Sequence, residues 1–362
     1  MIAFVLSGGG NRGALQVGAV QALLSRGIVP DILVGTSVGA LNAAYLAHNP
    51  SLATAQKLER LWGEVTNDDI YPGGPIAILW RLLRVRTSLF PNDSLYQFLC
   101  RHMPPGIGTF ADLTSTELYI VATELETGQM HVFGERSTDR VVDAIMASTA
   151  LPPLHPPWCV EGECYVDGGA VSDLPLRVAV EKEARTIYAL HLPAPLDPFP
   201  LPHSLADVAN RAFSALMQQQ VTLDFEKAAR ARGVTLHHIK LCPPSHLALS
   251  VRDFSQSAKL ISIGREQTER YLETQRTRPV SRRERLAHMV RKTAAQARTA
   301  IHRTIAQTHA AVNRMSLQVH EQVSLDSRRQ PKADGSSFKG GSAVGGQSSA
   351  VASEVSLTIN GR

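Results

Sequence analysis

A serine flanked by two glycines is the feature of this sequence best suited to nucleophilic chemistry. Residues 35–39 read GTSVG, with Ser37 between Gly35 and Gly39. This spacing is typical of a strand-to-helix elbow, a sharp turn that lifts a serine hydroxyl out of a sheet. Glycine neighbours let the turn close and let a substrate approach, because they have no Cβ atom. We therefore interpret Ser37 as a nucleophile for acyl hydrolysis or acyl transfer.

A glycine-rich segment at residues 7–13 (SGGGNRG) is a candidate anion site. It follows an apolar run at 2–6 and precedes helical spacing at 14–25, so we expect it at a helix N-terminus. Free amides and the helix dipole favour an anion there, either a phosphate or the oxyanion of a carbonyl under attack. The residues assigned to this loop are Gly8, Gly9, Gly10, Arg12 and Gly13.

The same glycines also satisfy the G-x-G-x-x-G pattern of dinucleotide-binding folds. That function requires an acidic residue at the end of the second strand to bind the ribose. Asp31 precedes the second predicted strand instead, and the far end of that strand carries Ser37. The sequence therefore disfavours a nicotinamide or flavin enzyme, and we expect no cofactor.

A candidate general base lies about 130 residues further along the chain. Asp167 ends the predicted strand at 164–166 and is followed by Gly168 and Gly169, which permit close approach. If Asp167 meets Ser37 in space, it can accept the hydroxyl proton directly. Asp-Gly pairs also form turns, so a structural role for Asp167 stays open.

Short apolar segments must position these groups. The runs at 2–6 and 32–34 are predicted to be buried strands, and 14–25 and 38–47 are predicted to be the helices that follow them. This alternation of strands and helices predicts an α/β fold with a mainly parallel central sheet.

Together these segments resemble the patatin-like phospholipases, lipid acyl hydrolases with a Ser-Asp dyad. The resemblance rests on GGGNRG at 8–13, GTSVGA at 35–40 and DGG at 167–169, supported by ASTALPPLHPP at 147–157. It covers about residues 1–275 and implies a three-layer α/β/α hydrolase domain over that range. Residues 93–95 and 122–124 also fall where the family has a substrate-cap helix and a central strand.

The resemblance implies a role for each motif. Ser37 would be the nucleophile, Asp167 the base and the amides of residues 8–10 the oxyanion hole, with Arg12 positioning the loop. One residue departs from the family pattern, because Asp173 stands before a leucine-proline pair where the family commonly has asparagine. That departure leaves the dyad intact and concerns only the support of the adjacent loop.

Histidines keep a serine-aspartate-histidine triad open as an alternative. Five of them lie between or after the candidate residues: His155, His191, His203, His237 and His238. The α/β-hydrolase fold places several strands before its elbow, whereas one predicted strand precedes Ser37. The sequence therefore favours the dyad.

Composition is typical of a globular enzyme, with 44% hydrophobic and 19% charged residues in a chain of 362. No run approaches the roughly 18 apolar residues of a membrane span, and residues 2–6 are too short a run for a signal peptide, so we expect a cytoplasmic protein, peripheral at a membrane. Cys159 and Cys164 are spaced for pairing across a hairpin, but free thiols are the expected state in a reducing compartment. The cysteines lack zinc spacing, and we expect no metal.

Positive charge is concentrated at the end of the chain. Residues 276–362 hold 15 of the 37 Lys and Arg but 5 of the 32 Asp and Glu. Apolar residues recur every three or four positions at 276–323, which predicts a basic amphipathic helical extension to about 325. Its candidate partners are an anionic membrane surface, another helix or the catalytic domain; nucleic acid is disfavoured because no aromatic residues are interleaved. The Gly/Ser-rich tail at 326–362 is predicted to be disordered.

A second arginine-rich apolar run lies at residues 75–90 (PIAILWRLLRVRTSLF). It is either a core helix or a lid whose apolar side faces acyl chains and whose arginines contact lipid phosphates. Exposure of Trp80 separates these two interpretations.

The sequence thus predicts a phospholipase A-type hydrolase that cleaves carboxylic esters of lipids. Glycerophospholipids are favoured because of the arginines near the predicted lid. Two alternatives remain: a non-lipid carboxylesterase or acyltransferase that uses the same serine, and a membrane-binding or partner-binding scaffold with a vestigial dyad.

Overall fold

The computed structural model describes residues 1–73, 80, 88–193, 205–244 and 253–277. Residues 1–278 form one compact unit. The predicted segments 276–325 and 326–362 lie outside the described residues, apart from the last residues of one helix.

The central sheet contains eight strands within the described part of the chain. Their bounds are β1 (Ile2–Leu6), β2 (Ile32–Thr36), β3 (Glu117–Glu124), β4 (Met130–Phe133), β5 (Trp158–Val160), β6 (Glu163–Asp167), β7 (Thr186–His191) and β8 (Thr235–Lys240). The order is β5-β6-β3-β2-β1-β7-β8, with β4 also paired to β3. Strands β3, β2, β1, β7 and β8 are mutually parallel, whereas β4, β6 and β5 join by antiparallel pairing.

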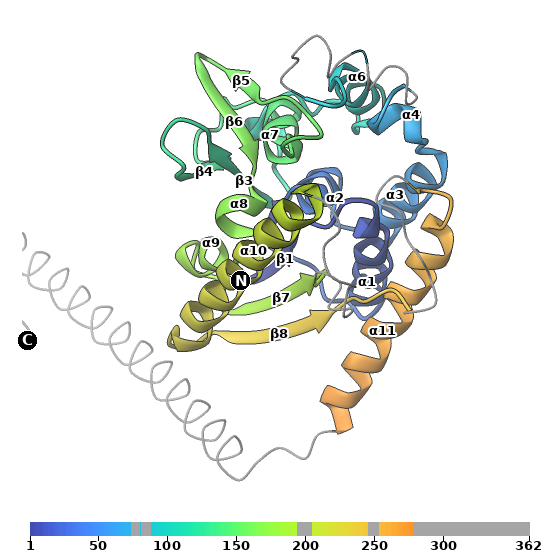
Figure 1. Ribbon diagram of the computed structural model, residues 1–362. Coiled ribbons are helices and arrows are strands. Elements are labelled where there is room, and N and C mark those ends of the chain that lie inside the picture. Colours follow the sequence, from blue (N-terminus) through green and yellow to red (C-terminus); the bar gives the residue numbers. More distant parts are fainter. Residues whose placement is uncertain (74–79, 81–87, 194–204, 245–252, 278–362) are drawn as a thin grey trace, which may run out of the picture. The chain divides into compact units, whose positions relative to one another are not determined.

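Helices cover both faces of this sheet (Figure 1). The α-helices are α1 (Gly13–Ser25), α2 (Val38–Ala47), α3 (Leu52–Glu64), α4 (Asn67–Ile70), α6 (Asp93–His102), α7 (Val141–Thr149), α8 (Gly169–Ser172), α9 (Leu176–Glu181), α10 (Leu205–Arg230) and α11 (Ser257–Thr277). Short 3-10 helices occupy Gly10–Arg12 (η1) and Phe110–Asp112 (η2).

Two separate apolar clusters show why the architecture has three layers. The larger cluster contains Phe4 and Leu33 with residues of α1, α2, α3, α7 and α11. The smaller contains Val5 and Val34 with residues of α9 and α10. Alternate residues of β1 and β2 therefore face opposite helix layers, as period-two side-chain alternation requires. The three-layer α/β/α fold with a mainly parallel sheet is confirmed.

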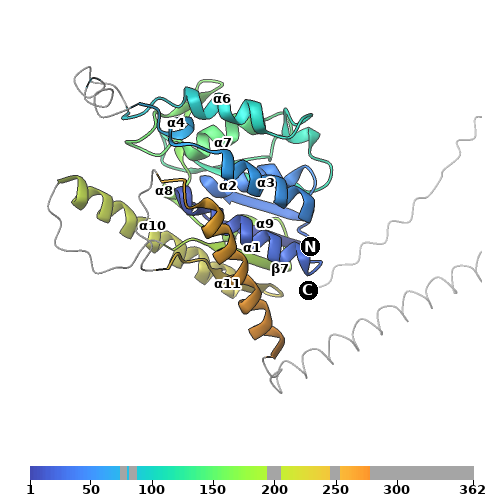
Figure 2. The ribbon, with the colours of Figure 1, turned by 90° about the vertical axis from the view of Figure 1, so that its right-hand side faces the viewer.

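Helix α11 packs closely along α1, as Figure 2 shows. The crossing depends on two glycines without Cβ atoms. A Cβ at Gly18 would lie 1.9 Å from the carbonyl oxygen of Ile261, and one at Gly264 would lie 2.0 Å from that of Leu15. The backbones of the two helices therefore approach more closely than any larger residue would permit.

Candidate active site

Ser37 lies at a strained turn between β2 and α2. Its backbone angles are φ 54° and ψ −125°, a conformation that non-glycine residues rarely adopt. The Ser37 amide donates to the hydroxyl of Ser148, which in turn donates to the carbonyl oxygen of Val121. Ser148, on α7, thus ties the turn to β3, and its position in the 147–157 motif is the signal that would have found it.

The two glycines of the elbow are required by close backbone approach. A Cβ at Gly35 would lie 2.4 Å from the carbonyl oxygen of Gly39. A Cβ at Gly39 would lie 2.3 Å from the carbonyl oxygen of Leu6, at the end of β1. Any side chain at either position would push α2 away from the strands, which explains the spacing around Ser37 in steric terms.

Asp167 ends β6 and meets Ser37 in space. The carboxyl is buried, with the residue 4% exposed, and its Oδ1 accepts a hydrogen bond of 2.8 Å from the Gly169 amide. Burial raises the pKa of Asp167 to about 6, while hydrogen bonds from the Ser37 side chain and the Gly169 amide lower it. The structure therefore brings together the two groups that the sequence analysis assigned to the dyad.

The loop after Asp167 is fitted against the sheet. A Cβ at Gly168 would lie 2.2 Å from the carbonyl oxygen of Val121, and one at Gly169 would lie 2.7 Å from Cε of Met217 on α10. The hydroxyl of Thr123 donates to the carbonyl oxygen of Asp167 over 2.9 Å. Both glycines pack too closely against neighbouring atoms to carry a side chain, and the Thr123 hydrogen bond fixes the end of the strand. Together these contacts fix the position of the Asp167 carboxyl.

The hairpin that delivers Asp167 carries a covalent cross-link. Cys159 on β5 and Cys164 on β6 are directly paired in the sheet and form a disulfide. The expectation of free thiols at these two positions is therefore wrong: the antiparallel register places the two side chains opposite each other, where a bridge can form. Cys100 and Cys242 are free and exposed.

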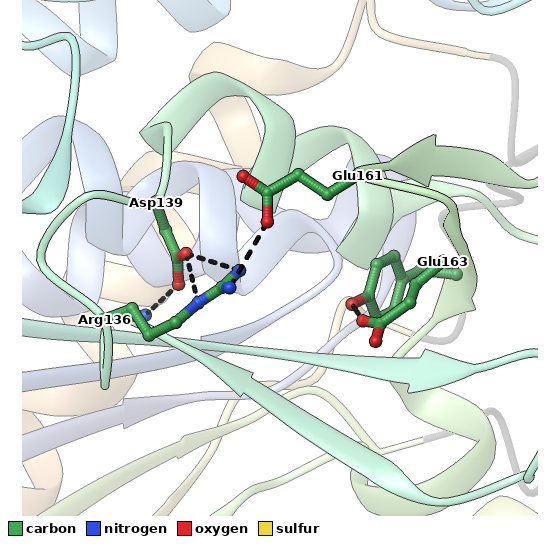
Figure 3. A network of polar contacts seen from close by, with 6 residues as sticks. Arg136, Asp139, Glu161 and Glu163 are labelled. Atoms are coloured by element: carbon green, nitrogen blue, oxygen red, sulfur yellow. Dashed lines mark hydrogen bonds and ion pairs between the residues drawn. The ribbon is translucent and has the colours of Figure 1, made fainter.

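An ion-pair network supports the same hairpin from outside (Figure 3). Arg136 binds Asp139 at 3.0 Å and Glu161, at the hairpin turn, at 3.3 Å. Glu163 accepts a short hydrogen bond from the hydroxyl of Tyr165. The strand that ends at Asp167 is thus tied down by its turn as well as by its disulfide.

The glycine-rich loop runs from β1 into η1 and α1, beside Ser37. The Gly8 amide donates to the carbonyl oxygen of Asp173 over 3.1 Å. The amides of Gly9 and Gly10 have no hydrogen-bond partner among the described residues. Gly10 also has φ 59°, which favours glycine. The oxyanion-hole interpretation therefore narrows to Gly9 and Gly10, because the Gly8 amide is already occupied.

Arg12 and Gly13 continue the loop. The Arg12 guanidinium donates from Nε to the carbonyl oxygen of Gly9 over 3.3 Å and from Nη1 to that of Pro193. Burial lowers the pKa of Arg12, while the charge of Asp173 raises it. A Cβ at Gly13 would lie 2.4 Å from Cγ2 of Val38, so this glycine lets α1 approach the nucleophile elbow.

Buried polar side chains behind the loop were not anticipated. Gln16 on α1 donates to the carbonyl oxygen of Ser7 over 2.8 Å, and Asn42 on α2 donates to the Gln16 side chain and to the Gly13 carbonyl over 3.0 Å each. Both residues are completely buried. Single amide residues within apolar helical runs are the sequence signal that would have located this network.

Asp173 is the second unanticipated group. It follows α8, is 7% exposed, and its Oδ1 is buried without a hydrogen-bond partner among the described residues. Burial raises the pKa of Asp173 to about 7, and the charge of Asp167 adds to that rise. The sequence analysis connected Asp173 only with the support of the loop, yet its carboxyl lies in the site.

The histidine alternative lacks structural support. His191 pairs with His238, His237 stacks on Tyr188, and His155 packs on Tyr71. Within the described ranges, no histidine is hydrogen-bonded to Ser37 or Asp167; His203 lies outside them. The described residues thus place no imidazole in hydrogen-bond contact with Ser37 or Asp167.

Two further findings limit what the described residues can bind or cross. None of them form a group of three or more His, Cys, Asp or Glu that could hold a metal ion. None of their helices has the length and apolarity that a bilayer crossing requires.

Most of the predicted lid, residues 75–90, lies outside the described residues. Trp80 is described and is 56% exposed, which fits the lid interpretation better than a core helix. The arginines of this segment, and the basic segment at 276–323 apart from its first two residues, lie outside the described residues.

Comparison with known proteins finds relatives of one family. The family model "Patatin-like phospholipase" matches residues 4–180. Mouse (Mus musculus) patatin-like phospholipase domain-containing protein 6 is 29% identical over 194 residues, 52% of this chain and 13% of that protein. Lysophospholipase NTE1 of Mycosarcoma maydis is 29% identical over 199 residues, 52% of this chain and 9% of that protein. The matched region thus spans a small fraction of these relatives.

Among solved structures, VipD from Legionella pneumophila aligns with a TM-score of 0.40 at 15% identity. The alignment covers 75% of this chain and 66% of that chain.

Proposed function

The chain belongs to the patatin-like phospholipase family through residues 4–180, and from this premise we propose that it is a serine lipid acyl hydrolase of the phospholipase A type. In this proposal Ser37 is the nucleophile and Asp167 is its base. The position of the strained serine beside a buried carboxyl, whose pKa the Ser37 side chain lowers, is the observation that carries it.

The first half-reaction forms an acyl-enzyme. Asp167 takes the hydroxyl proton as Ser37 Oγ attacks the ester carbonyl carbon, and negative charge moves to the carbonyl oxygen. The amides of Gly9 and Gly10, which have no partner among the described residues, are the donors available to stabilise this oxyanion. When the ester C–O bond breaks, Asp167 returns the proton to the departing alcohol.

The second half-reaction restores the enzyme. Asp167 takes a proton from water as the water oxygen attacks the acyl carbon. The bond between the acyl group and Ser37 then breaks, and Asp167 returns the proton to the serine oxygen. A buried carboxylate suits both halves, because burial raises its pKa toward neutrality and so strengthens it as a base.

Lipid esters are the proposed substrate on the strength of family membership and of the exposed Trp80. Glycerophospholipids are favoured because arginines flank that tryptophan in the sequence. We further propose that the basic segment at 276–323 contacts an anionic membrane surface or a helical partner, which would make the protein peripheral to a membrane.

The test measures fatty-acid release from mixed phospholipid vesicles and from a short-chain nitrophenyl ester. We expect Ser37→Ala and Asp167→Asn each to lower kcat at least about 10³-fold on both substrates while remaining folded. Ser25→Ala is the matched control, because Ser25 is an exposed serine at the end of α1.

Each outcome separates one alternative. Hydrolysis of the small ester alone would indicate a non-lipid esterase with the same serine. Full activity in Ser37→Ala would remove the dyad mechanism. No hydrolysis of either substrate by the wild-type protein, together with vesicle binding that survives Ser37→Ala, would favour the scaffold.

A further inference from the structure

Asp173 is a buried carboxyl group for which the proposed reaction has no use. It follows α8, and the residue is 7% exposed. Its Oδ1 is buried without a hydrogen-bond partner among the described residues. Burying an unpaired carboxylate costs free energy, so burial favours the protonated form of this group.

The Asp173 carboxyl faces the glycine-rich loop and the nucleophile. A Cβ at Gly8 would lie 2.5 Å from Asp173 Oδ1 and 3.3 Å from Ser37 Cβ. The carboxyl oxygen of Asp173 and the Cβ of Ser37 therefore both lie close to the same face of Gly8, the one from which a side chain would project. Asp173 also accepts the Gly8 amide through its main-chain oxygen. Its side chain is thus fixed beside the strand end from which the Gly9 and Gly10 amides follow.

The same oxygen lies near the base. A Cβ at Gly169 would lie 3.0 Å from Asp167 Oδ1 and 3.6 Å from Asp173 Oδ1, so both carboxyl oxygens surround one point. Two carboxyl groups that share a buried site do not both ionise readily, and the pair keeps one proton after losing the first.

Hydrogen bonding decides which carboxyl keeps that proton. Asp167 accepts from the Ser37 side chain and the Gly169 amide, which stabilise its charged form. The Gly8 amide and the charge of Arg12 favour the charged form of Asp173, but burial and the Asp167 charge outweigh them, and its Oδ1 has no hydrogen-bond partner among the described residues. The charged form therefore belongs to Asp167 and the proton to Asp173.

Other charged groups among the described residues act on Asp173 or lie beside it. Arg12, from the glycine-rich loop, favours its charged form, and Asp167, from β6, opposes it. Asp224, on α10, accepts a hydrogen bond from the Ser172 hydroxyl beside it. Burial, followed by the Asp167 charge, raises the pKa of Asp173 to about 7 despite Arg12 and the Gly8 amide.

We propose that Asp173 is a positioning residue of this active site that must hold its proton while Ser37 reacts. This inference rests on the proposed role of Ser37. An ionised Asp173 would place negative charge against the loop that has to stabilise the oxyanion, so it would oppose the transition state. Asp167 ionised and Asp173 neutral is then the one productive state, and reactivity falls on both sides of it.

The test is the rate at which a fluorophosphonate probe labels Ser37 in the full chain between pH 5 and 9.5. In the wild type we expect a bell-shaped profile whose alkaline limb falls tenfold per pH unit. In Asp173→Asn, which is neutral at every pH, the alkaline limb should disappear, so that the variant gains about 100-fold over the wild type between pH 7 and 9. Should the amide prevent folding, Asp173→Ala removes the same charge.

Asp224→Asn is the matched control, since it replaces another buried carboxyl near the same loop but leaves Asp173 in place. It should retain the alkaline limb. If the alkaline limb persists in the folded Asp173 variants while the probe labels only Ser37, the inference about Asp173 is wrong. The proposed role of Ser37 would then still stand. Label that persists in Ser37→Ala overturns the proposed function, and the inference with it.

Discussion

The proposed nucleophile and its proposed base are held by two different kinds of structure. Ser37 belongs to the parallel part of the sheet, where β1, β2 and the helices after them form one contiguous stretch of chain, residues 2–47. Asp167 ends β6, a strand that joins the sheet by antiparallel pairing to β3 and forms the edge hairpin with β5. The nucleophile is fixed by close backbone packing, whereas the base is fixed by pairing, a disulfide and surface ion pairs.

This difference teaches where each half of the site is sensitive to change. Backbone packing leaves no room for even one methyl group, so a single substitution on the nucleophile side should cause a large loss of stability. The base side distributes its support over several separate contacts, so the loss of any one of them should be tolerated. Four experiments test that comparison.

The largest effect on folding is expected from Gly39→Ala. The new Cβ would lie 2.3 Å from the backbone oxygen of Leu6, which cannot move without shifting β1. We expect the free energy of unfolding to fall by about 3 kcal/mol or more, above the usual cost of overpacking. Gly63→Ala, on α3, is the control: nothing lies within 4 Å of its Cβ, so denaturant unfolding should show a gain of about 0.5–1 kcal/mol. Equal stability of the two variants would contradict the packing argument.

On the base side, Cys159→Ser with Cys164→Ser should have a smaller effect. The bridge closes a short loop, with a sequence separation of 5, so its loss should cost about 2 kcal/mol of unfolding free energy. Hydrolysis should persist, because Asp167 keeps its contacts with Thr123 and Gly169. Thiol titration of the denatured wild type should give two free thiols before reduction and four after it; four before reduction would exclude the bridge.

The protonation of Asp167 predicts opposite pH trends for activity and stability. The base must be charged, so kcat/KM should rise about tenfold per pH unit up to about pH 6. Its pKa is raised above the value in the unfolded chain, so the stability it contributes is greatest at low pH and is lost as pH rises from about 4 to about 6. Thermal midpoints of the wild type and Asp167→Asn should therefore diverge across that window. A constant difference would contradict the raised pKa.

The smallest effect is expected for Glu161→Gln. The Arg136–Glu161 ion pair is exposed, with both side chains more than half accessible, and such pairs contribute little. Arg136 keeps its contact with Asp139 in this variant. The thermal midpoint and kcat should hardly change. A large loss of activity would show that the position of Asp167 depends on this one ion pair, which would contradict the view that several separate contacts support it.

Much of the nucleophile side was predictable because its signals are local. The strand at 2–6 and the helix at 38–47 have the predicted bounds, and the strand predicted at 32–34 extends to Thr36. Short apolar runs, helical periodicity and paired glycines are all properties of neighbouring residues. The same reasoning identified the strand that ends at Asp167, but it could not identify the strand with which this one pairs.

Sequence alone therefore determined which functional groups are present: an elbow serine, an aspartate at a strand end and a glycine loop at a helix N-terminus. Tertiary structure decided how that chemistry is arranged. It brought Asp167 to Ser37, occupied the Gly8 amide with the carbonyl oxygen of Asp173, and closed the Cys159–Cys164 bridge where free thiols were expected. It also buried the Asp173 carboxyl beside the dyad. The physical reason is that burial, hydrogen bonding and pairing depend on residues far apart in the chain, whereas propensity and spacing depend on neighbours.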